Sequence, residues 1–277
     1  MNQKPIKTIL CPTDFSEASE FGLDYAAHVA KLFFADIRLV YVRTSIWPEA
    51  IQLSQNAQES EEDISDRLST FCRETAEEFG VNCAYQTLTT TNTVEEAIAE
   101  QAKECDMIVM GTNGANDNYQ YLFGNNTFHV IQKTKCPVLV IPTGYLFKSI
   151  HTLVYAHHPD TNPIFLIDQL KTIIEPLNVA VKVVHVSEES PSTTTKHRLE
   201  ILREAVMARK LKGKEWSFDS LYSQDVAWAL DHYMKNHNGD ILALSFHHRQ
   251  LLEKLFTQDV VKQMTMIAEY PVLIFWH

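Results

Sequence analysis

Glycines at a defined spacing follow an apolar segment in the first half of the chain. The segment Met107–Met110 leads into Gly111 and Gly114, and Gly124 follows after nine further residues. Glycine has no Cβ, so backbone N–H groups at such positions can approach an anion closely. We expect Gly124 to open a helix, whose N-terminal N–H groups are unpaired and carry partial positive charge. The pattern therefore predicts a phosphate-binding cradle.

A second group of polar residues lies near the start of the chain, where a short apolar segment ends in Pro12, Thr13 and Asp14. Ser16 follows as a good helix N-cap, and acidic residues suit the first turn after it. Asp14 allows two interpretations. It is either a hydrogen-bond acceptor for a ligand, or a local cap or Asx-turn that serves only the backbone.

Short apolar runs alternate with amphipathic stretches along the whole chain, which is typical of βαβ units around a parallel sheet buried on both faces. In the first half we expect strands at residues 6–12, 36–43, 81–88, 106–111 and 137–142, and helices at 17–34, 58–79, 94–104 and 125–135. In the second half we expect strands at 151–156, 179–186, 216–221, 240–245 and 271–276, and helices at 162–176, 194–212, 225–236 and 256–268.

The second half also repeats the first in sequence. Lys7-Thr-Ile-Leu corresponds to His151-Thr-Leu-Val, and Cys136-Pro-Val-Leu-Val-Ile corresponds to Tyr270-Pro-Val-Leu-Ile-Phe. Repetition at this scale indicates a duplicated domain rather than a solenoid, because each unit is a whole sheet. We divide the chain into domains at residues 1–143 and 148–277. The junction is short, so the two domains should pack against each other.

The combination of Pro12-Thr-Asp-Phe-Ser16, the three glycines and the segment Cys136–Pro142 resembles the universal stress protein family, in its ATP-binding branch. The resemblance implies an α/β fold of two tandem doubly wound domains, packed as a pseudo-dimer. Each domain is then a five-stranded parallel sheet in the order 3-2-1-4-5 with helices on both faces. The last strands of the two domains are expected to pair across the interface. A ligand would lie beyond the carboxyl ends of strands one and four, where their connections diverge.

The resemblance further implies that ATP, with Mg²⁺ or Mn²⁺, binds in the first domain only. Pro12, Thr13 and Asp14 would hold the base and ribose, with Asp14 as an acceptor, and Val42 would cover the adenine. The remaining expected contacts are Met110, Gly111 and Gly114 along one wall, and Gly124, Asn125, Asn126 and Thr127 around the phosphates. The family usually has Ser or Thr where this chain has Asn125, but Asn also caps helices and its amide donates to phosphates.

The second domain lacks these glycines. Aligning Ile108-Val-Met-Gly111 with Ile241-Leu-Ala-Leu244 puts Leu244 at the first glycine, and Asp14 corresponds to His158. Side chains there obstruct the close approach of a phosphate, so we expect no ATP by this mode. Histidines converge instead, and a transition-metal site is weighed against the plainer interpretation of surface or loop histidines. The candidate ligands are His157, His158, His247 and His248.

Charge and composition exclude several classes of function. Residues 1–143 hold 20 acidic and 10 basic side chains, which accounts for most of the net charge of −11. No Lys/Arg block is present, so nucleic-acid binding is not expected. The apolar runs have the length of strands, and no membrane span is expected. Five cysteines without a CxxC spacing favour a reducing compartment, so we expect a cytoplasmic protein.

The expected function is that of a cytoplasmic universal stress protein. ATP binding in the first domain would change domain packing or the affinity for a protein partner of unknown identity, and a homodimer is a further open arrangement. No Walker A lysine, Gly-x-Ser-x-Gly elbow or positioned general base is found, so slow ATPase activity is the most that is expected. The alternatives are a structural or interaction protein that binds no nucleotide, and a metal-binding second domain.

Overall fold

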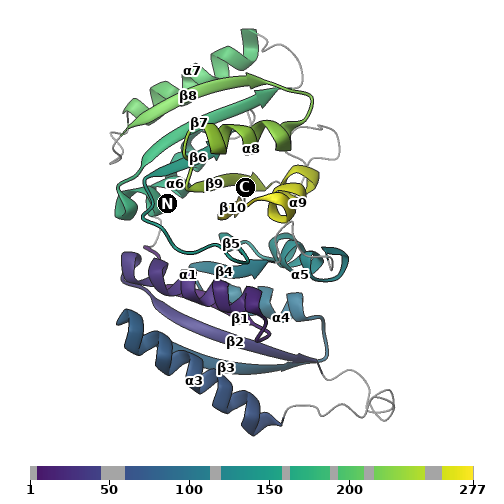
Figure 1. Cartoon of the computed structure of the whole chain (residues 1–277). Helices are drawn as coiled ribbons and strands as arrows, with labels where there is room; N and C mark the ends of the chain where they lie inside the picture. Colours follow the sequence, from purple (N-terminus) through teal and green to yellow (C-terminus); the bar gives the residue numbers. More distant parts are fainter. Residues whose placement is uncertain are drawn as a thin grey trace.

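The computed structural model describes residues 5–44, 60–112, 120–157, 163–187, 193–208, 215–246 and 258–276. The strands of the first half are β1 (Thr8–Thr13), β2 (Asp36–Thr44), β3 (Cys83–Thr90), β4 (Met107–Thr112) and β5 (Val138–Pro142). Those of the second half are β6 (Thr152–Ala156), β7 (Ala180–Ser187), β8 (Trp216–Tyr222), β9 (Ile241–Phe246) and β10 (Val272–Trp276). Together they form one ten-stranded sheet in the order β3-β2-β1-β4-β5-β10-β9-β6-β7-β8 (Figure 1).

Helices cover both faces of this sheet. One face carries α1 (Glu17–Phe33), α3 (Glu61–Phe79), α6 (Pro163–Leu177) and α7 (Thr193–Ala208). The other face carries α4 (Val94–Gln101), α5 (Gln120–Lys133), α8 (Val226–Asn236) and α9 (Gln258–Ile267), and a short 3-10 helix, η1 (Ala102–Glu104), follows α4. Each face is sealed by one cluster of buried apolar side chains that runs through both halves of the chain. The two halves therefore share their cores.

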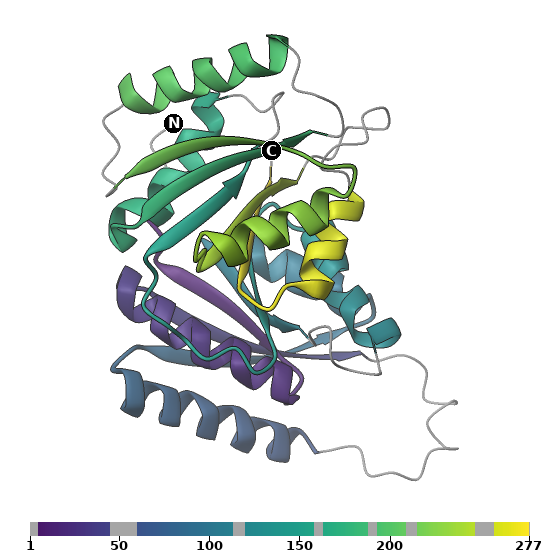
Figure 2. The same ribbon diagram turned by 45° about the horizontal axis from the view of Figure 1, so that its top comes forward.

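Each half has its five strands in the order third, second, first, fourth, fifth, and all neighbours within a half are parallel. Both are doubly wound α/β units, as predicted. β5 and β10 join the halves by antiparallel pairing, with Leu139 opposite Leu273. The predicted pairing of the last strands is thus confirmed. Helices α3 and α7 lie at opposite ends of the molecule (Figures 1 and 2).

One feature repeated in the two halves was not visible in the sequence comparison. Asp106 Oδ2 accepts the backbone N–H groups of Lys7, at 2.9 Å, and of Thr8, at 3.0 Å. In the second half, Asp240 Oδ2 accepts the backbone N–H groups of His151, at 2.7 Å, and of Thr152, at 2.9 Å. In both halves, an aspartate directly before the fourth strand thus accepts two hydrogen bonds from the backbone at the start of the first strand, which supports a duplication.

The predicted strands agree with the observed ones to within two residues. The prediction for α5 was wrong at its start, since the helix begins at Gln120 and Gly124 lies inside it. Residues 120–123 contain no proline, and one glycine inside a helix costs only about 1 kcal/mol, so Gly124 does not by itself set the boundary. Within the described ranges, no helix has the length and apolar character needed to cross a bilayer.

Candidate nucleotide site

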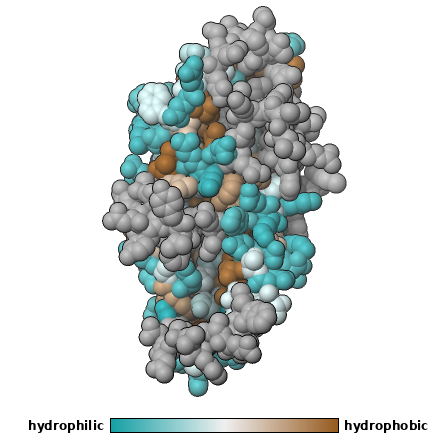
Figure 3. Space-filling model, turned by 90° about the vertical axis from the view of Figure 1, so that its right-hand side faces the viewer, coloured by the Kyte–Doolittle hydropathy of each residue, from teal (hydrophilic) through white to brown (hydrophobic). Residues whose placement is uncertain are grey.

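A cavity of about 330 Å³ lies where β1, β2 and β4 end. Small-molecule sites in proteins usually have volumes of about 300–1,000 Å³. Apolar side chains from β2, β4 and α4 line its depth, and the turn after β1 lines its mouth. The lining residues are Pro12, Thr13, Asp14, Ser16, Ala18, Ser19, Val40, Tyr41, Val42, Val94, Ile98, Met110, Gly111, Thr112 and Thr127. Figure 3 views the side of the molecule at which these strands end; among the residues coloured there, hydrophilic ones predominate and apolar ones lie between them.

Many residues of the sequence-predicted site meet in this cavity. Pro12, Thr13, Asp14, Val42, Met110, Gly111 and Thr127 all line it. Gly114 falls outside the described residues, and for Gly124, Asn125 and Asn126 only the helical backbone is described. The residues expected around base and ribose thus lie together, whereas most of the expected phosphate contacts remain a prediction.

The turn after β1 is built by hydrogen bonds among its own side chains. Asp14 Oδ1 accepts the N–H of Ser16 at 3.1 Å and also its hydroxyl. Ser16 Oγ accepts the N–H of Ser19 at 3.3 Å and so caps α1, as predicted. The local interpretation of Asp14 is therefore correct as far as it goes. It does not exclude a ligand, because Asp14 is exposed and its Oδ2 makes no hydrogen bond with the described residues.

Phe15 has a strained backbone conformation, and its ring packs against side chains of β2 and α3. Its φ of 61° is in the left-handed region, which costs a non-glycine residue about 1–2 kcal/mol. Thr13 Oγ1 accepts the Phe15 N–H at 3.1 Å. The Phe15 ring stacks on Tyr41 at 5.0 Å, meets Phe71 edge-on at 5.8 Å, and lies 3.8 Å below the guanidinium of Arg67. These contacts hold the turn in one conformation and so fix the position of the neighbouring Asp14.

Gly111 has a packing role that the sequence did not reveal. A Cβ at this position would lie 1.6 Å from the carbonyl oxygen of Ala18, and a Cβ on Gly22 would lie 2.6 Å from the amide nitrogen of Gly111. Helix α1 therefore crosses β4 with backbone against backbone. The absence of a side chain at Gly111 is required by this contact alone, whether or not a ligand binds.

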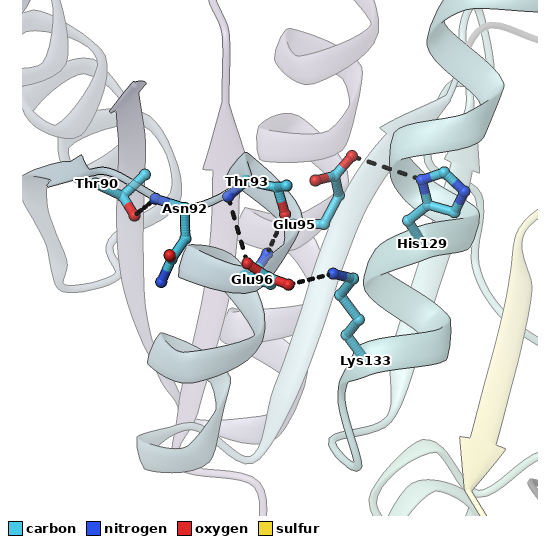
Figure 4. A network of polar contacts seen from close by, with 7 residues as sticks. All are labelled: Thr90, Asn92, Thr93, Glu95, Glu96, His129 and Lys133. Atoms are coloured by element: carbon cyan, nitrogen blue, oxygen red, sulfur yellow. Dashed lines mark hydrogen bonds and ion pairs between the residues drawn. The ribbon is translucent and has the colours of Figure 1, made fainter. Parts of the chain in front are cut away.

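Two ion pairs hold α4 against α5 beside the cavity (Figure 4). The Glu95 carboxylate lies 3.6 Å from His129 Nδ1, and Glu96 accepts a hydrogen bond from Lys133 Nζ at 2.7 Å. Burial raises the pKa of Glu95, but hydrogen bonds from its own backbone, from Thr93 and from His129 outweigh this, and the pKa is lowered. The Glu95 carboxylate therefore stays charged where it faces His129 of α5.

These ion pairs lie beside the cavity and outside its lining. Val94 and Ile98 line it from α4, and Thr127 lines it from α5, two residues before His129. Thr93 begins α4 with a capping box, in which its hydroxyl accepts the N–H of Glu96 at 3.3 Å. The wall between β2 and α5 is therefore positioned by contacts that do not themselves line the cavity.

Strand pairing gives the equivalent positions in the second half. The sequence repeat aligns β1 with β6, and the pairing of these strands with β4 and β9 places Ser245, not Leu244, at the position of Gly111. The predicted alignment was therefore wrong by one residue. The apolar residues of the two segments do not by themselves fix the register, whereas aligning Asp106 with Asp240, which directly precede them, does. A slip by one residue turns every side chain to the other face.

Side chains fill the corresponding space in the second half. His157, Leu230, Leu244 and Phe246 occupy the positions of Thr13, Ile98, Met110 and Thr112, and all four are buried. The Phe246 ring lies 4.8 Å from that of Trp276 and 6.3 Å from that of Phe128. At two of these positions a larger side chain replaces a smaller one, His157 for Thr13 and Phe246 for Thr112.

The histidines of the second half are only partly described. His157 and His185 are both buried, and His185 Nδ1 donates a hydrogen bond to the carbonyl oxygen of His157 at 3.0 Å. Burial lowers the pKa of His185. His158, His247 and His248 lie outside the described residues, so the metal site remains an untested hypothesis. Across the described part of the chain, no three His, Cys, Asp or Glu side chains are grouped to hold a metal ion.

Comparisons with known proteins agree with this fold. The family model described as universal stress protein family matches residues 5–142. A universal stress protein of Methanocaldococcus jannaschii is 32% identical over 142 residues, which cover 49% of this chain and 81% of that protein. A second one from the same organism is 28% identical over 152 residues, covering 49% and 94%. The crystal structure of a universal stress protein from Archaeoglobus fulgidus superposes with a TM-score of 0.72 at 17% identity, over 97% of this chain and 98% of that one.

Proposed function

The chain belongs to the universal stress protein family, and we propose that its first half binds an adenine nucleotide in the cavity at the ends of β1, β2 and β4. The observation that carries the proposal is the convergence of residues from separate parts of the sequence. Pro12, Thr13 and Asp14 reach the cavity from β1, Val42 from β2 and Met110 from β4. Each was expected there before its position in the fold was known.

The lining suits the base and the sugar of a nucleotide. Val40, Val42, Ile98 and Met110 offer apolar surface to the faces of a purine ring. At the mouth, the free Oδ2 of Asp14 is an acceptor for a ribose hydroxyl, and a hydrogen bond to a charged group contributes about 1.5–3 kcal/mol. A volume of about 330 Å³ is at the lower end of the usual range, so we assign the base and ribose to the cavity and the phosphates to its opening.

The phosphates have few protein charges to meet. Among the described lining residues there is no Lys, Arg or His, and Asp14 is the single acidic one. Neutralisation would come from backbone N–H groups, the Thr127 hydroxyl and a divalent cation. Mg²⁺ typically binds through substrate phosphates with only one or two carboxylates, so we assign the cation to ATP rather than to a protein cage. When bound, it would neutralise phosphate charge.

We further propose that nucleotide occupancy serves regulation rather than turnover. β4 lines the cavity and pairs with β5, which pairs with β10 of the other half. A ligand held against β4 and α5 therefore lies one strand away from the junction of the two halves. The second half would bind no nucleotide in the same way, because the buried side chains of His157 and Phe246 stand where the first half has the smaller Thr13 and Thr112.

Calorimetric titration of nucleotide-free protein with Mg-ATP tests the nucleotide site and its restriction to the first half. We expect one site per chain. A Val42→Trp variant places an indole at the half-buried wall of the cavity and should abolish binding. Leu32→Trp is the matched control, because Leu32 is 40% exposed at the far end of α1, and it should leave binding unchanged.

Each outcome of the titration has a clear meaning. No binding heat and no stabilisation of the wild-type chain by Mg-ATP would contradict the nucleotide site and favour a protein that acts through interactions alone. Two sites per chain would contradict the assignment of the second half. Unchanged binding in Val42→Trp would show that the nucleotide lies elsewhere.

A further inference from the structure

Two cysteines that no sequence pattern marked lie next to each other in the first half. Cys72 on α3 and Cys83 at the start of β3 have their sulfur atoms 2.8 Å apart, with the Cys83 thiol donating to Cys72. Both are free thiols in this structure. The end of α3 and the turn at Gly80 lie between them in the chain. The spacing of the two cysteines matches no known motif. Only the packing of α3 on β3 brings them together.

We propose that Cys72 and Cys83 are a peroxide-oxidisable dithiol, whose disulfide reversibly ties α3 to the edge strand β3. This modification site does not depend on nucleotide binding. It lies near the cavity without lining it: Phe71, the neighbour of Cys72, meets Phe15 of the turn edge-on at 5.8 Å.

The five cysteines of the chain differ in the direction of their pKa shifts. The thiolate is the nucleophilic form of cysteine, and a lowered pKa increases its share. The hydrogen bond from Cys83 lowers the pKa of Cys72, whereas burial raises the pKa of Cys11 and of Cys136 to about 12 and also raises that of Cys105. Cys72 is thus the one cysteine favoured as a nucleophile, and it has a second thiol in contact.

The oxidation can be written with hydrogen peroxide as the oxidant. The Cys72 thiolate attacks one peroxide oxygen, the O–O bond breaks, and the hydroxide that leaves takes up a proton to become water. Cys72 is then a sulfenic acid, the first step of the oxidation ladder. Cys83 loses its proton and attacks this sulfur, so that the S–S bond forms, the S–O bond breaks and a second water leaves. Two electrons pass from the two thiols to one peroxide, which becomes two waters.

The surroundings favour a disulfide over a thiolate metal site. Structural zinc needs four ligands, and no third His, Cys, Asp or Glu of the described residues joins this pair in a metal-binding group. Cys83 is half-buried on an edge strand, so the pair is near the surface, while Cys72 is buried. A small oxidant reaches such a site more easily than a protein thiol does.

Peptide mapping of the full chain tests the proposal directly. Reduced protein is treated with hydrogen peroxide, blocked with N-ethylmaleimide, denatured and cut with trypsin. Arg73 lies between the two cysteines, so Cys72 falls on peptide 68–73 and Cys83 on peptide 74–103, and neither peptide holds another cysteine. We expect these two peptides to be recovered as one disulfide-linked species that dithiothreitol separates.

Three variants make the test specific. Cys83→Ser should lose the linked species and leave a sulfenic acid on Cys72 that dimedone traps, and Cys72→Ser should lose both products. Cys105→Ser is the matched control and should form the link at the wild-type rate. The proposal is overturned if both peptides carry the maleimide while Cys105 or Cys136 is oxidised, or if Cys72 is instead linked to Cys11.

Discussion

Replacing Gly111 with alanine would place a methyl group where the backbone of α1 lies. The new Cβ would meet the carbonyl oxygen of Ala18 at 1.6 Å and its carbonyl carbon at 2.3 Å, whereas real Cβ contacts stay above 3.0 Å. Neither atom belongs to a flexible side chain. To lengthen this contact from 1.6 Å to 3.0 Å, helix α1 has to move away from β4 by about 1.4 Å.

The cost follows from what α1 buries. The helix has ten buried residues, and seven of them, including Tyr25 and Phe33, belong to the apolar core on its face of the sheet. Added carbon atoms in a well-packed core cost about 1–3 kcal/mol, and a clash with backbone belongs at the upper end. We expect Gly111→Ala to lower the free energy of unfolding by about 3 kcal/mol, which is a fall in Tm of roughly 6–12 °C for a chain of about this size.

Thermal unfolding followed by circular dichroism measures this change. The control is Ser245→Ala at the equivalent position, where a Cβ is already present and the loss is one hydrogen bond, between Ser245 Oγ and the Tyr155 hydroxyl at 3.2 Å. We expect that variant to lose only about 1 kcal/mol. If Gly111→Ala melts as the wild type does, α1 does not lie against β4 at this point and the reasoning is refuted. If it melts normally but no longer binds nucleotide, the glycine serves the ligand instead.

Three further predictions address the site, the pH dependence and the junction of the halves. Asp14→Asn keeps an acceptor for Ser16 but removes the charge, so we expect ATP affinity to fall roughly tenfold with little change in Tm; unchanged affinity in a titration would remove Asp14 from the site. Burial lowers the pKa of His185, so the unfolded chain binds more protons below about pH 6.5, and stability present above that pH is lost as the pH falls toward the folded-state pKa. His185→Asn keeps a donor for the His157 carbonyl without titrating, and its Tm should fall less between about pH 7 and pH 5; an equal fall would contradict this. Leu139→Ala, in β5 opposite Leu273, should cost about 2–5 kcal/mol and shift one common unfolding transition in calorimetry, whereas two separate transitions would show that the halves do not share their cores.

The sequence predicted the fold well because its main signal is local. Apolar runs such as Met107–Met110 and Val138–Ile141 mark buried strands wherever they occur, and amphipathic runs between them mark helices. The doubling of the pattern and the matching last strands indicated two equal halves. The start of α5 at Gln120 was predicted wrongly, because helical propensity extends through residues 120–123 and a single glycine does not stop a helix.

The candidate site was predictable in part for the same reason. Pro12, Thr13 and Asp14 stand at the end of a strand, and Gly111 near the end of another, so the order of strands alone places them at one edge. The walls from α4 could not be foreseen. Val94 and Ile98 are ordinary apolar residues of an amphipathic helix, and their place in the cavity depends on how α4 packs against the sheet and α5.

By itself, then, the amino-acid sequence determined the alternation of strands and helices, the duplication and the half that carries the glycine pattern, since each depends on residues near one another in the chain. The tertiary structure alone decided that Gly111 supports α1, that Ser245 is its counterpart, and that Cys72 meets Cys83. Such contacts join residues that are distant in sequence or placed by the register of packed elements, and neither periodicity nor spacing encodes them.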